Sequence, residues 1–436
     1  MIGKRFQYLF VASFGGILLS AMLIASLRPL PSGVRAEAPD STLLEIYSHW
    51  TSGREGDGLN ALIGVFTSTY TNTSAMVLSD YDELADRITS GNPPDGFVIH
   101  CGNELFYTWV EPGDYITPIT QLWTNQDWMD KFPQDLIDML TNQGELYCVP
   151  LNIHRGNVLW YNKQVFSDTG LTPPMTFTEF FTVAEALETA GKIPLALGDV
   201  GTWTAGHVME TVLLGSMGPE KYRGLWDGTT PFNGPEVKDA LAVFDHMLDY
   251  ANPDHSTLSW DQAAQLVGNG EAGMTIMGDW AEGYFEDMGL SPDVDFGWIP
   301  VPGSNGSFMV VNDGFAMPRN APHSENATNW LITVASVEGQ DTFSPFKGAI
   351  PARLDANPGL HGVYFQSAMA DYATDELVPT LVHGIAASPS FVSATYSILE
   401  DFMANGNIES TANAWQQAAC EAGFGKCPVF LPLIVK

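Results

Sequence analysis

Short apolar runs alternate with segments of helical spacing along the whole chain, and each apolar run ends at glycine or at polar residues. The clearest unit covers residues 258–280, L-S-W-D-Q-A-A-Q-L-V-G-N-G-E-A-G-M-T-I-M-G-D-W. Its pattern predicts a short helix over 261–267, a turn over 268–270 and a strand over 273–277. A strand of about five apolar residues is typical of the buried parallel sheet of an α/β protein.

Asp279 and Trp280 follow this strand, at the carboxyl end where open α/β sheets bind their ligands. Gly278 allows a sharp turn before them, and Trp260 stands near the start of the same unit. A carboxylate beside two indoles suits a sugar, because the carboxylate accepts hydroxyl hydrogens and the rings cover C–H faces. The alternative is that both tryptophans belong to the core and that Asp279 caps the next helix.

Three strands in the first half of the chain also end in polar or aromatic side chains. The run L-L-E-I-Y-S-H-W ends at Trp50, and Glu55 follows in the loop before a predicted helix. F-V-I-H-C-G carries His100, and V-P-L-N-I-H-R ends in asparagine, histidine and arginine. Such endings predict a shared binding site at one edge of a sheet. Glu55 has an equally good structural role, as a charge that favours the first turn of its helix.

The second half continues the alternation. S-F-M-V-V-N-D-G-F-A-M-P reads as an apolar strand that is interrupted at Asp313, where an unpaired carboxylate would be costly. Lys347 lies in the apolar, glycine-flanked F-K-G-A-I-P, and His383 lies in L-V-H-G. Helical spacing recurs over 178–190, 205–217, 235–250, 325–336 and 337–343.

Length and net charge limit the domain organisation and the classes of binding partner. The 436 residues exceed one ordinary core and predict two domains. Asp and Glu number 51 against 18 Lys and Arg, a net charge of −33, which argues against nucleic acid and anionic membranes as partners. The cysteines do not form a zinc-ligand pattern, and no metal or organic cofactor is expected.

The amino terminus predicts export. Lys4 and Arg5 precede an uncharged run over 6–27, and Val34-Arg35-Ala36 offers a cleavage site. Residues 1–36 are either a cleaved signal peptide or a retained anchor, since 22 residues are enough to span a bilayer. The protein is therefore expected in the periplasm or at the cell surface.

Four cysteines fit an oxidising compartment. Cys420 and Cys427 would close a small loop that contributes about 2.5 kcal/mol through loop entropy. The sequence leaves open whether Cys101 and Cys148 also pair.

These motifs together resemble the extracellular solute-binding proteins of carbohydrate ABC importers, the family of maltose-binding protein. The similarity runs from residue 43 to about 414, and within the family it is greatest to glucose/galactose/mannose-type monosaccharide binders. It is carried by E-I-Y-S-H-W-T-S-G-R-E-G, F-V-I-H-C-G-N-E-L, V-P-L-N-I-H-R-G-N-V, P-L-A-L-G, L-S-W-D-Q-A, M-G-D-W-A-E-G-Y, G-Q-D-T-F-S-P-F-K-G, A-R-L-D, Q-S-A-M-A-D and L-V-H-G.

The resemblance implies an α/β, two-lobe periplasmic-binding-protein-like fold of type II with the ligand between the lobes. Lobe I would comprise 41–150 plus 313–358 and lobe II 151–312 plus 359–436, with hinges near 151–152, 310–313 and 356–372. The implied function is capture of a monosaccharide, glucose or a close epimer, by a monomer that delivers it to ABC transporter permeases. The implied sugar contacts, carried over by motif or lying nearby, are Trp50, Glu55, His100, Trp260, Asp279, Trp280, Asp313, Lys347 and His383.

This chain differs from the monosaccharide-binding relatives at positions that bear on which sugar is bound. The relatives carry an aromatic pair where this chain has His49-Trp50, so a polar group replaces one stacking surface, and the loop before Glu55 is one residue longer.

Two other functions fit the same residues. A secreted glycoside hydrolase needs two carboxylates across the scissile bond, and Glu55 with Asp313 or Asp279 would supply them. A membrane-tethered domain that senses sugar without importing it would keep the 6–27 run as an anchor.

Overall fold

The computed structural model describes residues 42–425. The predicted signal or anchor segment and Cys427 lie outside the described residues, so the export signal and the 420–427 pairing stay predictions. No helix within 42–425 is long and apolar enough to cross a membrane.

The strands form two main sheets, as the alternation of elements predicts for an α/β protein. The larger is seven-stranded, with the order β12-β6-β11-β3-β1-β2 and with β13 also paired to β11; the second has the order β10-β7-β9-β8. The larger sheet contains β1 (Leu43–Tyr47), β2 (Ser74–Leu78), β3 (Gly96–Ile99), β6 (Cys148–Arg155), β11 (Ser307–Ala316), β12 (Ile350–Pro351) and β13 (Glu376–Pro379). The others are β7 (Val158–Asn162), β8 (Ile193–Ala196), β9 (Ala272–Ile276), β10 (Phe296–Pro300) and the small hairpin β4 (Thr141–Asn142) and β5 (Glu145–Leu146).

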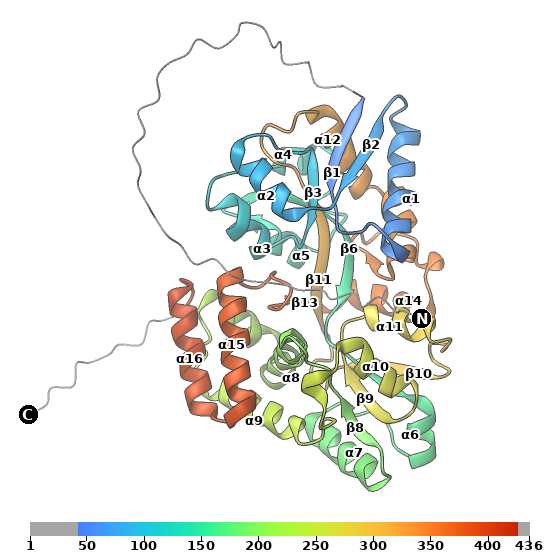
Figure 1. Ribbon diagram of the computed structural model, residues 1–436, viewed down its shortest axis with the longest axis vertical. Coiled ribbons are helices and arrows are strands. Elements are labelled where there is room, and N and C mark those ends of the chain that lie inside the picture. The colour runs from blue at the N-terminus through green and yellow to red at the C-terminus, as the bar shows by residue number, and fades with distance from the viewer. Residues whose placement is uncertain (1–41, 426–436) are drawn as a thin grey trace, which may run out of the picture. The chain divides into compact units, whose positions relative to one another are not determined.

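Helices cover both sheets: α1 and α12 pack on the larger sheet, and α6, α7 and α10 pack on the smaller one (Figure 1). The helices up to the smaller sheet are α1 (Gly53–Thr69), α2 (Tyr81–Ser90), α3 (Asn103–Leu105), the π-helix η1 (Phe106–Val110), α4 (Thr120–Asn125), α5 (Gln134–Met139), α6 (Lys163–Thr169) and α7 (Phe177–Thr189). Those that follow are α8 (Trp203–Asp227), α9 (Pro235–Leu248), η2 (His255–Thr257), α10 (Trp260–Gly268), α11 (Trp280–Asp287), α12 (Ser324–Ala335), α13 (Val337–Lys347), η3 (Pro358–Leu360), α14 (Val363–Tyr372), α15 (Pro389–Asn405) and α16 (Ile408–Glu421).

The 258–280 unit folds as its pattern predicts, into α10, β9 and the start of α11. A capping box at Ser259 and Gln262 starts α10. β9 is fully buried, and it pairs in parallel with β8 but antiparallel with β7. The expected parallel pairing therefore holds on one side only.

β11 contains the interruption that the sequence indicates. Its register against β6 shifts between Asp313 and Gly314. A Cβ at Gly314 would lie 2.4 Å from the Cys101 Sγ and 2.5 Å from the Val149 carbonyl oxygen, so only glycine allows this approach. Cys101 and Cys148 form a disulfide here, which links the end of β3 to the start of β6.

The predicted helix over 205–217 is confirmed and extends further. α8 continues past Gly218, whose φ of 77° and ψ of 168° break the helical path before Pro219. The predicted end at 217 therefore marks a kink rather than the end of the element.

The chain passes three times between the larger sheet and the hydrophobic core that contains the smaller sheet and α15. It leaves β6 at Arg155 and enters β7 at Val158; it returns from β10 into β11 through 301–306. The third passage runs from β12 through α14 and β13 into α15, which packs on α8. Residues 151–155 and 307–312, close to the predicted hinges, thus belong to strands of the larger sheet.

Candidate functional site

Glu55 and Lys347 meet at the ends of two packed helices. Glu55 lies in the first turn of α1 and Lys347 is the last residue of α13, positions where the helix dipoles favour an anion and a cation. The Lys347 ammonium lies 2.5 Å from the Glu55 carboxylate and 5.6 Å from the centre of the Trp50 ring. Only 11% of the Lys347 side chain is exposed, so it is not a surface lysine.

Asp313 stands beside this pair at the irregularity in β11. Its Oδ2 accepts a hydrogen bond from the Asn152 amide at 2.9 Å, and its Oδ1 lies 3.6 Å from the His100 Nε2. Burial alone would raise the pKa of Asp313, but the positive charges of Lys347 and His100 outweigh it and hold that pKa below its usual range. Asp313 is therefore an anion that is largely withdrawn from water.

His100 follows β3 and is held between two carboxylates. Its Nδ1 contacts the Glu104 carboxylate at 2.7 Å, while its Nε2 faces Asp313. Burial would lower the pKa of His100, but the charge and the hydrogen bond of Glu104, aided by Asp313, raise it to about 9. His100 is thus a cation at neutral pH. Glu55, His100, Asp313 and Lys347 are called the charged group below.

A second set of side chains is aromatic: Trp203 and His207 on α8, Trp280 on α11, and His383 after β13. The centre of the His383 ring lies 5.2 Å from Trp280, 6.0 Å from His207 and 6.2 Å from Trp203. These four residues are called the ring group. Burial, together with the charges of His100 and His207, holds the pKa of His383 well below its usual range, so this imidazole is neutral.

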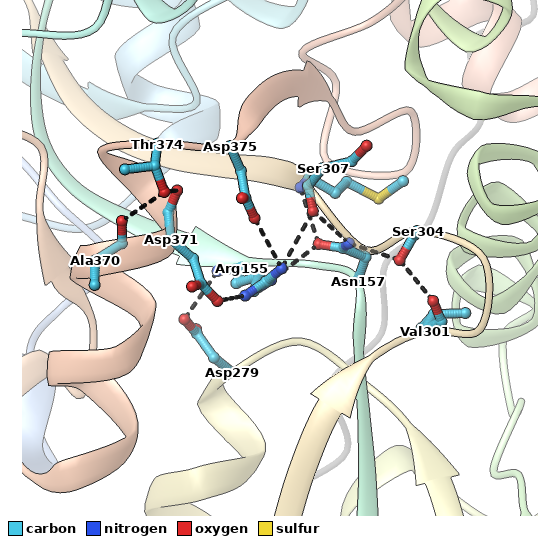
Figure 2. Close-up of polar contacts among 11 residues, drawn as sticks. Arg155, Asn157, Asp279, Val301, Ser304, Ser307, Ala370, Asp371, Thr374 and Asp375 are labelled. Carbon is cyan, nitrogen blue, oxygen red and sulfur yellow. Dashed lines mark hydrogen bonds and ion pairs between the residues drawn. The ribbon is translucent and has the colours of Figure 1, made fainter. Parts of the chain in front are cut away.

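Close approach to glycine sets the position of Trp280. A Cβ at Gly278 would lie 2.2 Å from the Trp280 indole, so the ring lies directly over the glycine backbone. Asp279 does not cap α11 with its side chain. Its carboxylate contacts the His154 Nδ1 at 2.5 Å. It also accepts the Arg155 backbone N–H at 2.8 Å (Figure 2). The capping alternative is therefore wrong.

The two groups touch through His100 and His383, whose ring centres are 5.7 Å apart. The segment that carries His383 docks on α3: the Glu104 backbone N–H donates to the Gly384 carbonyl, and that of Asn103 donates to the Ile385 carbonyl. Gly384 has a φ of 72°, which favours glycine. Charged hydrogen-bonding groups thus face aromatic rings, an arrangement that can bind a polyhydroxylated ring.

Comparison with known proteins agrees with this architecture. Residues 50–341 match the model of the family described as bacterial extracellular solute-binding protein. The chain belongs to this solute-binding protein family. An uncharacterized ABC transporter extracellular-binding protein of Pyrococcus horikoshii is 35% identical over 381 residues, which cover 85% of each chain. The xylose/arabinose-binding protein of Haloferax volcanii is 27% identical, covering 87% of this chain and 84% of that protein.

Among solved structures, the bacterial solute receptor AcbH, described as exclusively preferring β-D-galactopyranose, superposes with a TM-score of 0.75. The match covers 87% of this chain and 98% of that one at 17% identity, which shows the fold alone. The solute-binding protein described here therefore has the two-lobe, type II periplasmic-binding-protein fold, as the resemblance implies.

Most of the predicted contact residues of this solute-binding protein lie in or beside the charged group and the ring group. Trp50 and Trp260 are the two whose surroundings differ from the prediction. Trp50 is only 1% exposed, packed against Phe343 with ring centres 5.0 Å apart. Trp260 is half-buried and contacts Tyr284 at 5.7 Å. Within the described part of the chain, no ring contact joins Trp260 to the ring group. Trp260 and Trp280 both pack against the hydrophobic core and both stay partly exposed, so neither is fully a core residue.

Other residues at the site were not among the predicted contacts. Trp203, His207 and His154 contact the ring group or Asp279, and Asn152 bonds Asp313. For Asn152 and His154 the signal was present, since both lie at the polar end of the run V-P-L-N-I-H-R, whereas Trp203 and His207 lie in the first turns of α8. His49, the departure from the relatives, is exposed and interacts electrostatically with Asp313, Glu55 and Lys347.

One surface hollow lies apart from this site. A hollow of about 230 Å³ lies beside α14, lined by Arg353, Met369 and Tyr372 among others, and contains none of the predicted contacts. Within residues 42–425, no set of three or more His, Cys, Asp or Glu is arranged to hold a metal ion.

Proposed function

We propose that this protein is an extracytoplasmic receptor that captures a monosaccharide, glucose or a close epimer, and delivers it to the permease subunits of an ABC transporter. The observation that carries the proposal is the opposition of the charged group and the ring group. Asp313, Lys347 and Glu55 supply fixed partners for hydroxyls, while Trp280 supplies an apolar face. Hydrogen bonds to charged groups contribute about 1.5–3 kcal/mol each, so a few of them account for micromolar binding.

The relatives support the transport role. The Pyrococcus horikoshii protein is described as an ABC transporter component and the Haloferax volcanii protein as a xylose/arabinose binder. A single chain with one such site acts as a monomer in this scheme. The residues that we assign to the sugar are Glu55, His100, Asp279, Trp280, Asp313, Lys347 and His383, with Trp50 as the support beneath Lys347 and Trp260 at the margin.

The electrostatics of Asp313 do not suit the general-acid role in a glycoside hydrolase. A glycosidase needs one carboxyl group with a raised pKa to act as a general acid. The pKa of Asp313 is shifted in the opposite direction by Lys347 and His100. As a receptor that releases its sugar unchanged, the protein should form no product on incubation with aryl glycosides and oligosaccharides.

Binding should close the two lobes about these three passages of the chain. Small-angle scattering should then show a smaller radius of gyration at saturating sugar. An unchanged radius, in a protein whose ligand-free form is shown to be open, would contradict closure.

A thermal-shift screen against monosaccharides and disaccharides, followed by calorimetry, tests the ligand assignment. A true ligand at a hundredfold excess over its dissociation constant stabilises the protein by about 2.7 kcal/mol. Glucose, galactose or mannose should shift the transition. If only longer glycans or non-sugars shift it, the monosaccharide assignment is wrong.

A further inference from the structure

All three passages of the chain meet at the side chain of one arginine (Figure 2). Arg155 is the last residue of β6, and its Nε donates to the Asn157 Oδ1 at 3.2 Å in the first passage. Its Nη2 donates to the Ser307 carbonyl at 3.2 Å, where the second passage enters β11. Its Nη1 and Nη2 reach Asp371 at 2.5 Å and Asp375 at 3.5 Å, on either side of the turn between α14 and β13.

Arg155 is buried, so its guanidinium depends on these hydrogen bonds and ion pairs. Only 5% of its side chain is exposed, and its guanidinium carbon lies 5.0 Å from the centre of the Phe308 ring. A buried guanidinium is tolerated only when its donors are paired, so these partners are held to it and to one another. An arginine suits this position because its planar fork donates in several fixed directions at once, which a lysine ammonium on a flexible stem does not reproduce.

The first two passages are also joined directly. The Asn157 amide donates to the Ser304 Oγ and to the Ser307 carbonyl, both at 2.9 Å, and its Oδ1 accepts the Met309 N–H at 2.9 Å. Ser304 in turn donates to the Val301 carbonyl at 2.7 Å. Figure 2 shows this chain of contacts leading from Val301 to the guanidinium.

The backbone of the same segment holds the site. The Arg155 N–H donates to the Asp279 carboxylate at 2.8 Å, and the Asp279 N–H donates back to the Arg155 carbonyl at 3.0 Å. The other carboxylate oxygen of Asp279 contacts His154. The next residue, Gly156, has its carbonyl 2.9 Å from the His207 Nε2 of the ring group. Residues 154–156 therefore contact two residues of the site, Asp279 and His207, and all three passages of the chain.

We propose that Arg155 is a positioning residue that couples occupancy of the site to the relative position of the two lobes. Its backbone fixes Asp279 and, through Gly156, His207, while its side chain keeps the three passages in one arrangement. A ligand that stacks on the partly exposed Trp280 bears on the adjacent Asp279, which is bonded to the segment that carries the guanidinium. This inference rests on the proposed function for the nature of the ligand, but the mechanical role of Arg155 does not depend on which ligand binds.

The test measures the distance between the lobes in ligand-free protein. Spin labels on cysteines introduced at the exposed positions Ser68 of α1 and Glu188 of α7 report on helices that pack on different sheets. The double variant Asp371→Asn/Asp375→Asn removes the carboxylate partners of Arg155 without deleting a buried side chain. The matched control is Asp355→Asn: Asp355 pairs with Arg353, another buried arginine, but the two lie on one segment.

We expect the double variant to broaden the distance distribution and the control to leave it unchanged. Arg155→Lys should give an intermediate width, since the ammonium keeps one charge contact and loses the fork. D-Glucose should then bind the double variant several-fold more weakly than the control, because fewer molecules occupy the binding-competent arrangement. A distribution in the double variant that matches that of Asp355→Asn would overturn the inference. Failure of wild-type protein to bind D-glucose would instead count against the proposed ligand and leave the ligand-free result standing.

Discussion

The charged group and the ring group are built by different means. The four members of the charged group come from α1, the end of β3, β11 and α13, and partners of opposite charge hold them in place. Two members of the ring group lie four residues apart on α8, and close packing on glycine backbone positions a third, Trp280. Charges must be paired to be buried, whereas rings need only space and a close neighbour. Both groups join positions that are distant in sequence, the charged group through ion pairs and the ring group through ring contacts among α8, α11 and the segment after β13.

The largest effect should come from neutralising the charged group. Asp313→Asn removes the anion that lies between His100 and Lys347, and we expect sugar binding to weaken by about 3 kcal/mol in calorimetry. Asp114→Asn is the control, because Asp114 forms an exposed ion pair with Arg319. Equal sugar affinities of Asp313→Asn and Asp114→Asn would show that the charged group does not bind the sugar hydroxyls.

Removing the principal ring should have a smaller effect. Trp280→Ala should weaken binding by about 2 kcal/mol, through lost apolar burial and ring contact, and should reduce the ligand-induced change in tryptophan fluorescence. Trp260→Ala serves as the comparison, since Trp260 pairs with Tyr284 rather than with the ring group. A larger loss at Trp260 than at Trp280 would move the sugar toward α10.

The stability of the protein should depend on the protonation of Glu282, a buried residue of α11. Burial, reinforced by the charges of Glu286 and Asp279, raises the pKa of Glu282 to about 8. The folded protein then holds a proton that the unfolded chain releases near its ordinary pKa of 4.5, so stability falls as pH rises from about 4.5 to 8.

Glu282→Gln should remove this fall and raise the free energy of unfolding by at least about 1 kcal/mol at pH 8.5, with little change at pH 4.5. Denaturant titrations at both pH values measure it. Glu286→Gln, at an exposed neighbour whose charge adds less than burial to the shift, should give only part of the gain. A wild-type stability that rises between these pH values, with Glu282→Gln unchanged, would contradict the assignment.

The smallest expected effect is the difference in pKa between His100 and His383, the two imidazoles through which the charged group and the ring group touch. His100 should titrate near pH 9 and His383 should stay neutral throughout, and NMR of the ring carbons measures both. Because the pKa of His100 is raised, its contribution to stability is complete below about pH 6.5 and is lost as pH rises through about 9. A higher pKa for His383 than for His100 would contradict the assignment of His100 to the charged group and of His383 to the ring group.

Local patterns predicted the elements that carry the site. The 258–280 unit, the break in the strand at Asp313 and the polar strand ends all depend on neighbours in sequence, so spacing and glycine were sufficient. The α/β class and the family followed from the order of these motifs.

Contacts distant in sequence were not predictable in the same way. Trp50 was expected to face the sugar, but Phe343 and Phe315 pack against its ring and bury it. Nothing near Trp50 in the sequence indicates those partners. The docking of the segment after His383 on α3 likewise joins positions about 280 residues apart, and it brings His383 to His100.

The most direct test of the account is the crystal structure of the protein with D-glucose bound. The account predicts one pyranose ring stacked on Trp280, with hydroxyls within hydrogen-bonding distance of the Asp313 carboxylate and the Lys347 ammonium. Electron density for sugar that contacts only one of the two groups, or lies elsewhere on the protein, would contradict it.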